Sequence, residues 1–244
     1  MRSLVVVPTY QEAENVEHFL AAVRAAVPNA EILVVDDNSP DRTGDLAEKV
    51  AAELGKITVL HRAGKEGLGA AYREAFGWAL ESGFDVIVQM DCDFSHDPDM
   101  IPVLIDRVTN GDADASVGSR YVPGGATPHW PYYRQALSRY GNRYTSAVLG
   151  LGISDATSGF RAYRAATLRA IAVETTRSSG YAFMSELAHR MVRQRLTMVE
   201  VPITFVDRTH GTSKMSARII VESMALVSAW GVQARIERLR ARHG

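Results

Sequence analysis

Residues 85–93, which read D-V-I-V-Q-M-D-C-D, carry the clearest fold signal in this chain. The apolar run at 86–90 has the length of a strand and no polar alternation, which is typical of a strand buried on both faces within a parallel sheet. Asp91 and Asp93 follow it at once. We therefore expect both carboxylates to lie at the carboxyl end of a buried strand.

The same pattern recurs through the first half of the chain. Predicted strands occupy residues 3–7, 31–36, 57–60, 85–90 and 114–118. Predicted helices occupy residues 11–26, 43–54, 67–81 and 98–109. This alternation predicts an α/β fold with a mostly parallel sheet and helices on both faces. Ligands of such sheets bind beyond the carboxyl ends of the strands, where Pro8, Asp37 and Asp91 all fall, so we expect these segments to converge on one crevice.

The second half of the chain has a weaker pattern. Residues 122–131 are rich in proline and glycine and predict a loop that can act as a lid. Further helices are predicted at 132–149, 182–194 and 215–238, with a strand near 198–206. The last helix allows two interpretations: an amphipathic helix packed on the core with a solvated basic tail, or an anchor on anionic lipid.

Bulk composition excludes several classes of protein. The chain has 244 residues, 46% of them apolar, which is enough for one large domain with a full core. Basic and acidic residues number 27 and 28, so a nucleic-acid binder that works by bulk charge is excluded. The single cysteine, Cys92, allows no internal disulfide and is interpreted as a small buried residue. No apolar run reaches the length of about 18 residues needed to span a membrane.

The D-x-D at 91–93 suits a hard divalent cation. Mg²⁺ and Mn²⁺ prefer oxygen ligands, and Mg²⁺ keeps several waters and is usually shared with substrate phosphates. The alternative is a strand-end turn with two solvated aspartates. The residues that follow, Ser95 and His96, are a weak ligand and a turn residue.

Seven blocks in order resemble the inverting glycosyltransferases of family 2, and among them the polyprenol-phosphate (dolichol-phosphate) mannosyltransferases. The blocks are P-T-Y-x-E at 8–12, V-D-D-N-S-P-D at 35–41, the glycine-rich run 64–69, D-x-D at 91–93, G-S-R-Y at 118–121, S-G-F-R at 158–161 and R-x-x-G-x-S-K at 208–214. The resemblance covers about residues 3–215. It implies a Rossmann-like, GT-A type nucleotide-sugar-binding fold, with 1–214 as the catalytic domain and 215–244 as a C-terminal amphipathic, basic helix facing a membrane or a partner.

The resemblance also implies a site for the nucleoside of the donor. Pro8, Tyr10 and Glu12 would cradle it, although a strand stop, a turn aromatic and a helix-start carboxylate are the alternative roles. Val35 would contact the base through its backbone. Asp37 would accept hydrogen bonds from the N1–H and amino group of guanine. The glycine-rich run lacks the order of a phosphate loop and is interpreted as allowing a helix to pack close to the sheet.

The phosphate-handling and acceptor residues are implied in the same way. Asp91, Cys92 and Asp93 would hold Mg²⁺ or Mn²⁺ and the diphosphate, and the family often has a further ligand where this chain has Ser95. Positively charged side chains would hold the two phosphate groups, a structural ion pair being the alternative for the first: Arg120, Arg208 and Lys214. Residues assigned to the acceptor phosphate are Arg134, Arg143, Ser158 and Arg161, where a turn at 158–159 is the alternative.

The implied reaction transfers mannose from GDP-mannose to a polyprenyl phosphate with inversion. A phosphate monoester needs no general base, because its second pKa is about 6. The implied location is the cytoplasmic face of a membrane, where the protein would be peripheral or docked to a membrane-embedded partner. Two alternatives stay open: a glucosyltransferase that uses UDP-glucose, and a non-catalytic sugar-nucleotide-binding subunit of a membrane complex.

Overall fold

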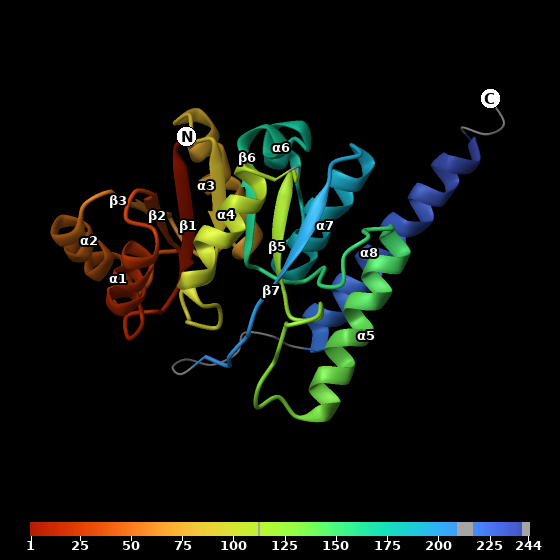
Figure 1. Cartoon of the computed structure of the whole chain (residues 1–244), viewed down its shortest axis with the longest axis horizontal. Helices are drawn as coiled ribbons and strands as arrows, with labels where there is room; N and C mark the ends of the chain where they lie inside the picture. Colours follow the sequence, from red (N-terminus) through yellow and green to blue (C-terminus); the bar gives the residue numbers. More distant parts are fainter. Residues whose placement is uncertain (112, 209–216, 241–244) are drawn as a thin grey trace.

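The computed structural model describes residues 1–111, 113–208 and 217–240, without the side chains of 181, 217–222, 238 and 239 (Figure 1). Within these residues one sheet has the strand order β3-β2-β1-β4-β6-β5-β7. Its strands are β1 (Ser3–Thr9), β2 (Glu31–Asp36), β3 (Ile57–His61), β4 (Val86–Gln89), β5 (Ala115–Ser119), β6 (Arg161–Arg164) and β7 (Met198–Pro202). Only β6 among these runs antiparallel to its neighbours, so the predicted mostly parallel sheet is confirmed.

Helices cover both faces of this sheet. They are α1 (Val16–Ala26), α2 (Thr43–Leu54), α3 (Leu68–Glu81), α4 (Ile101–Thr109), α5 (Tyr132–Leu149), α6 (Ala165–Ala170), α7 (Gly180–Arg193) and α8 (Ala217–Arg240), with short 3₁₀ turns η1 (Pro98–Met100) and η2 (Val173–Thr175). The long predicted helices are therefore confirmed, whereas α6 and β6 were not predicted.

Alternation along the strands explains the two layers. Val5 and Val7 face a core that includes side chains from α1, α2 and α4, such as Phe19. Leu4 and Val6 face the opposite core, which α3, α6 and α7 cover and which includes Tyr72. Successive side chains of a strand point to opposite faces, so an unbroken apolar run fills both cores.

The final helix packs along two others. Trp230 of α8 stacks on His189 of α7, with ring centroids 6.2 Å apart. A Cβ on Gly231 would lie 2.4 Å from Cγ1 of Val148 in α5, so the glycine permits the close approach of α5 and α8. Val227 is buried, but Val232 and Ile236 are exposed. The amphipathic character expected for this helix is not confirmed, and the boundary at residue 214 lies outside the described residues and stays a prediction.

A bilayer-spanning segment was not expected from the sequence. Across 1–111, 113–208 and 217–240, no helix combines the length and the apolar character needed to cross a membrane.

Candidate active site

A cavity of about 490 Å³ opens at the carboxyl ends of β1, β2 and β4, where the sequence predicted a crevice. In Figure 1, β1 runs downwards from the N-terminus, so these strand ends face the lower part of the view. Eight of the residues predicted for the donor and metal sites line this cavity: Pro8, Tyr10, Glu12, Asp37, Asp91, Cys92, Asp93 and Arg208.

Asp37 lies at one end of this cavity and is paired with Arg62. The Arg62 guanidinium is buried and donates to Asp37, to Glu66 at 2.9 Å and to Glu74 at 2.8 Å. Burial raises the pKa of Asp37, and Arg62 opposes that rise through its hydrogen bond and its charge. Sequence reasoning missed Arg62, although its place directly after a predicted strand beside the one that leads to Asp37 was a usable signal.

Neighbouring polar groups fix the turn that carries Tyr10. Asp36 accepts hydrogen bonds from Thr9 and from Ser39, so it has a structural role. Lys65 extends over the ring of Tyr10 with its Nζ 3.9 Å from the ring centroid. The cation and the aromatic ring attract each other, which holds the loop after β3 against the turn after β1.

Asp91 and Asp93 form the second charged end of the cavity. Asp93 is buried, and its carboxylate accepts from the Ser95 amide at 3.0 Å and lies 3.2 Å from Nη2 of Arg208. Desolvation raises the pKa of Asp91 to about 7, and the adjacent charge of Asp93 acts in the same direction. Two carboxylates crowded in this way repel each other, and a divalent cation between them would relieve that repulsion.

The donor set therefore fits a hard cation that completes its shell elsewhere. Among the described residues, no group of three or more His, Cys, Asp or Glu side chains is arranged so that it could hold a metal ion by itself. Water and the oxygens of a diphosphate would supply the remaining ligands, as is usual for Mg²⁺. His96 is buried between Phe160 and Phe205, and burial lowers its pKa to about 4, so it is a packing residue.

Arg120 does not line the cavity. It forms the structural ion pair that was the alternative to its predicted role at the phosphates. Its Nε and Nη2 donate to the two oxygens of the buried Asp155, both at 2.7 Å, and its backbone amide donates to Asp155 at 3.1 Å. A bidentate pair of this kind is geometrically rigid. Arg120 therefore braces the loop after β5 against the segment around Asp155.

The residues assigned to the acceptor phosphate do not line the cavity either, although Thr157 and Gly159, on either side of Ser158, do. Arg161 corrects the expectation most clearly: it is fully buried, and its guanidinium donates to the carbonyl oxygens of Ala156, Ser158 and Met184. Ser158 is buried in the turn before β6, which is the alternative role stated for it. Arg134 pairs with Asp207, and Arg143 is exposed on α5. Of the other predicted site residues, Val35, expected at the base, is fully buried in β2. Lys214, expected at the phosphates, lies outside the described residues.

One wall of the cavity was not predicted from the sequence. It comes from the turn before α7 and the first part of that helix, with Ser179, Gly180, Ala182 and Met184. Glu186 accepts from the amides of Arg177 and Ser178 and fixes this turn. A Cβ on Gly69 would lie 2.3 Å from the Ser178 carbonyl oxygen, so the glycine-rich run allows close packing against this turn rather than against the sheet.

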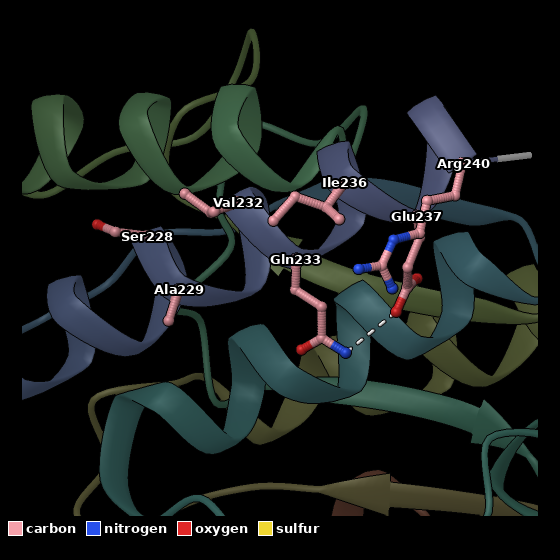
Figure 2. Close-up of a pocket in the computed structure, with 7 residues that line it drawn as sticks. All are labelled: Ser228, Ala229, Val232, Gln233, Ile236, Glu237 and Arg240. Atoms are coloured by element: carbon pink, nitrogen blue, oxygen red, sulfur yellow. Dashed lines mark hydrogen bonds between the residues drawn. The ribbon is translucent and has the colours of Figure 1, made fainter. Parts of the chain in front are cut away.

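A second hollow lies on α8, away from these charged groups. Figure 2 shows it, and its volume is about 610 Å³. Its lining residues all belong to α8 and none of them lines the first cavity: Ser228, Ala229, Val232, Gln233, Ile236, Glu237 and Arg240. It has one carboxylate, Glu237, and no carboxylate pair of the kind that Asp91 and Asp93 form.

Comparison with known proteins identifies the family of this chain. The model of the family described as Glycosyl transferase family 2 matches residues 4–171. This chain belongs to glycosyl transferase family 2. The glycosyltransferase is 49% identical over 244 residues to the undecaprenyl-phosphate mannosyltransferase of Micrococcus luteus, with all of both chains covered. It is 46% identical to the polyprenol monophosphomannose synthase of Mycolicibacterium smegmatis, over 98% of this chain and 90% of that one.

Solved structures support the fold of the glycosyltransferase. Glucosyl-3-phosphoglycerate synthase from Mycobacterium tuberculosis, solved in complex with Mn²⁺, UDP and glucosyl-3-phosphoglycerate, superposes with a TM-score of 0.64. The alignment covers 97% of this chain and 79% of that one, at 17% sequence identity. At this identity the likeness establishes a shared architecture, and the predicted GT-A type fold is confirmed.

Proposed function

We propose that this glycosyltransferase moves mannose from GDP-mannose to a polyprenyl phosphate, with inversion at the anomeric carbon. The product would be a lipid-linked mannosyl donor. The observation that carries the proposal is one cavity lined by Asp37, which is paired with Arg62, and by the carboxylate pair Asp91 and Asp93 beside Arg208. The two full-length relatives, both named for mannose transfer to polyprenyl lipids, support the choice of sugar and acceptor.

The donor would lie along the strand ends. Asp37 faces the cavity with a carboxylate that Arg62 already fixes on one side, which leaves further lone pairs for the N1–H and amino group of guanine. A pyrimidine lacks this pair of adjacent donors. Pro8, Tyr10 and Glu12 would enclose the ribose, and the diphosphate would then reach Asp91 and Asp93.

A divalent cation held by Asp91 and Asp93 would neutralise the charge that develops on the departing GDP. Arg208 would add a planar donor to the phosphate oxygens, and Lys214 a point charge. The acceptor phosphate is already anionic at neutral pH, so the chain needs no general base and must instead bring two anions together.

The lipid acceptor implies work at a membrane surface, and we place the protein at the cytoplasmic face as a peripheral protein or one docked to a membrane-embedded partner. Four large side chains on α5 support this part of the proposal, because they are more than 60% exposed: Tyr132, Tyr133, Leu137 and Tyr140. Tyrosine is favoured at membrane–water interfaces, where the ring is buried and the hydroxyl stays wet.

The test is a transfer assay on the purified chain with polyprenyl phosphate and Mn²⁺ or Mg²⁺. GDP-mannose and UDP-glucose are supplied in separate reactions, and NMR of the product gives the anomeric configuration. We expect mannosyl transfer with inversion, and loss of the metal on chelation should abolish it. The Asp93→Asn variant is the matched inactive control.

Two results would overturn the proposal. A clear preference for UDP-glucose would make the chain a glucosyltransferase of the same family. Tight sugar-nucleotide binding without any transfer, in the presence of acceptor and metal, would identify a non-catalytic subunit.

A further inference from the structure

The segment that follows β7 is held from two sides by its backbone. The Phe205 amide donates to the Ala126 carbonyl at 2.9 Å, and the Val206 amide donates to the Ser95 carbonyl at 3.1 Å. Ala126 belongs to the loop after β5, and Ser95 lies two residues after the carboxylate pair. Residues 205–206 therefore bridge the loop before α5 and the loop that carries Asp93.

Asp207 fastens this segment to the start of α5. One of its carboxylate oxygens accepts from Nε1 of Trp130 at 3.0 Å, and the other accepts from Nη1 of Arg134 at 2.8 Å. The Arg134 guanidinium also lies over the Trp130 ring, 3.9 Å from its centroid. Both oxygens are thus engaged by a paired indole and guanidinium, which defines the direction of the carboxylate.

The next residue points to a different partner. Nη2 of Arg208 lies 3.2 Å from Oδ2 of Asp93 and lines the cavity. Asp207 and Arg208 are consecutive, so an anchor on the first limits where the second can reach. The Asp207 side chain is 47% exposed, and an ion pair at that exposure contributes little to stability. Its geometric effect on the neighbouring arginine is then the larger consequence.

We infer that Asp207 is a positioning residue for Arg208. Through Trp130 and Arg134 it fixes the chain so that the Arg208 guanidinium reaches the phosphate end of the cavity. This assigns Arg134 a role through Asp207, in place of the direct contact with acceptor phosphate that its sequence position suggested. The inference rests on the proposed function only in that Arg208 is taken to contact phosphate.

A double-mutant cycle between Asp207 and Arg208 tests this inference. Asp207→Asn keeps the shape of the side chain but removes the charge that holds Arg134. We expect it to lower kcat about tenfold in the otherwise wild-type chain and by less than about twofold in an Arg208→Ala background, because its effect passes through Arg208. Glu17→Gln removes a comparably exposed ion pair, with Lys49, and should leave kcat unchanged.

The cycle is repeated on binding, which separates this inference from the proposed function. Calorimetry with Mn²⁺ measures GDP affinity, or UDP affinity if the chain selects that nucleotide. We expect Asp207→Asn and Arg208→Ala to weaken binding, and the double variant to match Arg208→Ala alone. Equal losses from Asp207→Asn in both backgrounds, or no loss in either, would overturn the inference even if mannose transfer is established. Failure of mannose transfer with a non-additive binding cycle would overturn only the proposed function.

Discussion

The two charged ends of the cavity differ in how their carboxylates are paired with cations. At the base end, Asp37 is paired with the buried Arg62, a cation supplied by the fold itself. At the phosphate end, Asp91 and Asp93 lie together, and Arg208, with 29% of its side chain exposed, forms an ion pair with Asp93. One carboxylate is compensated before any ligand binds, and the other two repel each other.

This difference predicts different behaviour towards ligands. A carboxylate fixed by an internal guanidinium is pre-organised and loses little freedom when a base binds. A crowded carboxylate pair gains most from a cation that arrives with the substrate. The base end should therefore control affinity and nucleotide selectivity, whereas the phosphate end should control turnover.

The largest effect is expected from Asp93→Asn. The change removes one charge from the carboxylate pair at little steric cost, so cation binding and phosphate neutralisation should both fail. We expect turnover to fall at least about a hundredfold, equivalent to roughly 2.7 kcal/mol in the barrier. Steady-state assays at limiting metal measure this, with circular dichroism to show that the fold is kept. A variant that retains a tenth of wild-type turnover would contradict the assignment.

Asp37→Ala should act on affinity and leave the chemistry alone. Loss of charge-assisted hydrogen bonds to guanine should weaken GDP binding by about 1.5–3 kcal/mol. The rate at saturating donor should change little, because the base is remote from the bond that breaks. Calorimetry with GDP and UDP measures the first effect, and Asp45→Ala, on the exposed side of α2, is the control. Unchanged GDP affinity would remove Asp37 from the site.

The smallest effect should come from Arg62→Met, and it depends on pH. Burial raises the pKa of Asp37 and Arg62 lowers it, so removing the guanidinium should raise that pKa further. A protonated Asp37 cannot accept from the guanine N1–H, so the GDP affinity of the variant should rise with pH, by about threefold, at pH values above the ordinary titration range of an aspartate. The wild type should change less over this range. Glu74→Gln removes another partner of the same guanidinium and should not introduce the pH dependence.

A flat pH profile for Arg62→Met, with equal losses for GDP and UDP, would show that Arg62 only supports the loop. Titration calorimetry at three pH values distinguishes the two cases. Thermal unfolding of the variant is measured alongside, because Arg62 is buried.

The parts of the fold that could be predicted are those in which local pattern and final environment agree. Residues 86–90 are apolar except for Gln89 and β4 is buried along its whole length, so the strand and the carboxylates that follow it could be predicted. Strand β6 was not, because Arg161–Arg164 begins and ends with arginine and inserts antiparallel between β4 and β5. Its place in the sheet depends on pairing with strands that are distant in sequence, and the hydrophobic periodicity of the segment itself cannot predict that pairing.

The same limit applies to the site. Pro8, Asp37 and Asp91 were predicted from their positions at strand ends, which is a property of the sheet. Arg120 was assigned to phosphate, because no feature of the sequence near it indicates that it pairs with Asp155. Arg62 was missed for the converse reason: its partner Asp37 is 25 positions away, and the pairing exists only when β2 and β3 align. Positions at strand ends can therefore be predicted from the sequence, whereas ion pairs between distant segments cannot.

The buried guanidinium of Arg161 bears on how sequence blocks are used. It joins the turn before β6 to Met184 on α7, a residue of the cavity wall, through bonds to three backbone carbonyls. A screen scored by lost activity would count this arginine among the reacting groups, although its side chain is fully buried and bonded to backbone carbonyls. The arginine of the S-G-F-R block is then an architectural signature, whereas Gly159 of the same block lines the cavity. A search based on the block would retrieve chains that share this wall, whatever sugar or acceptor they use.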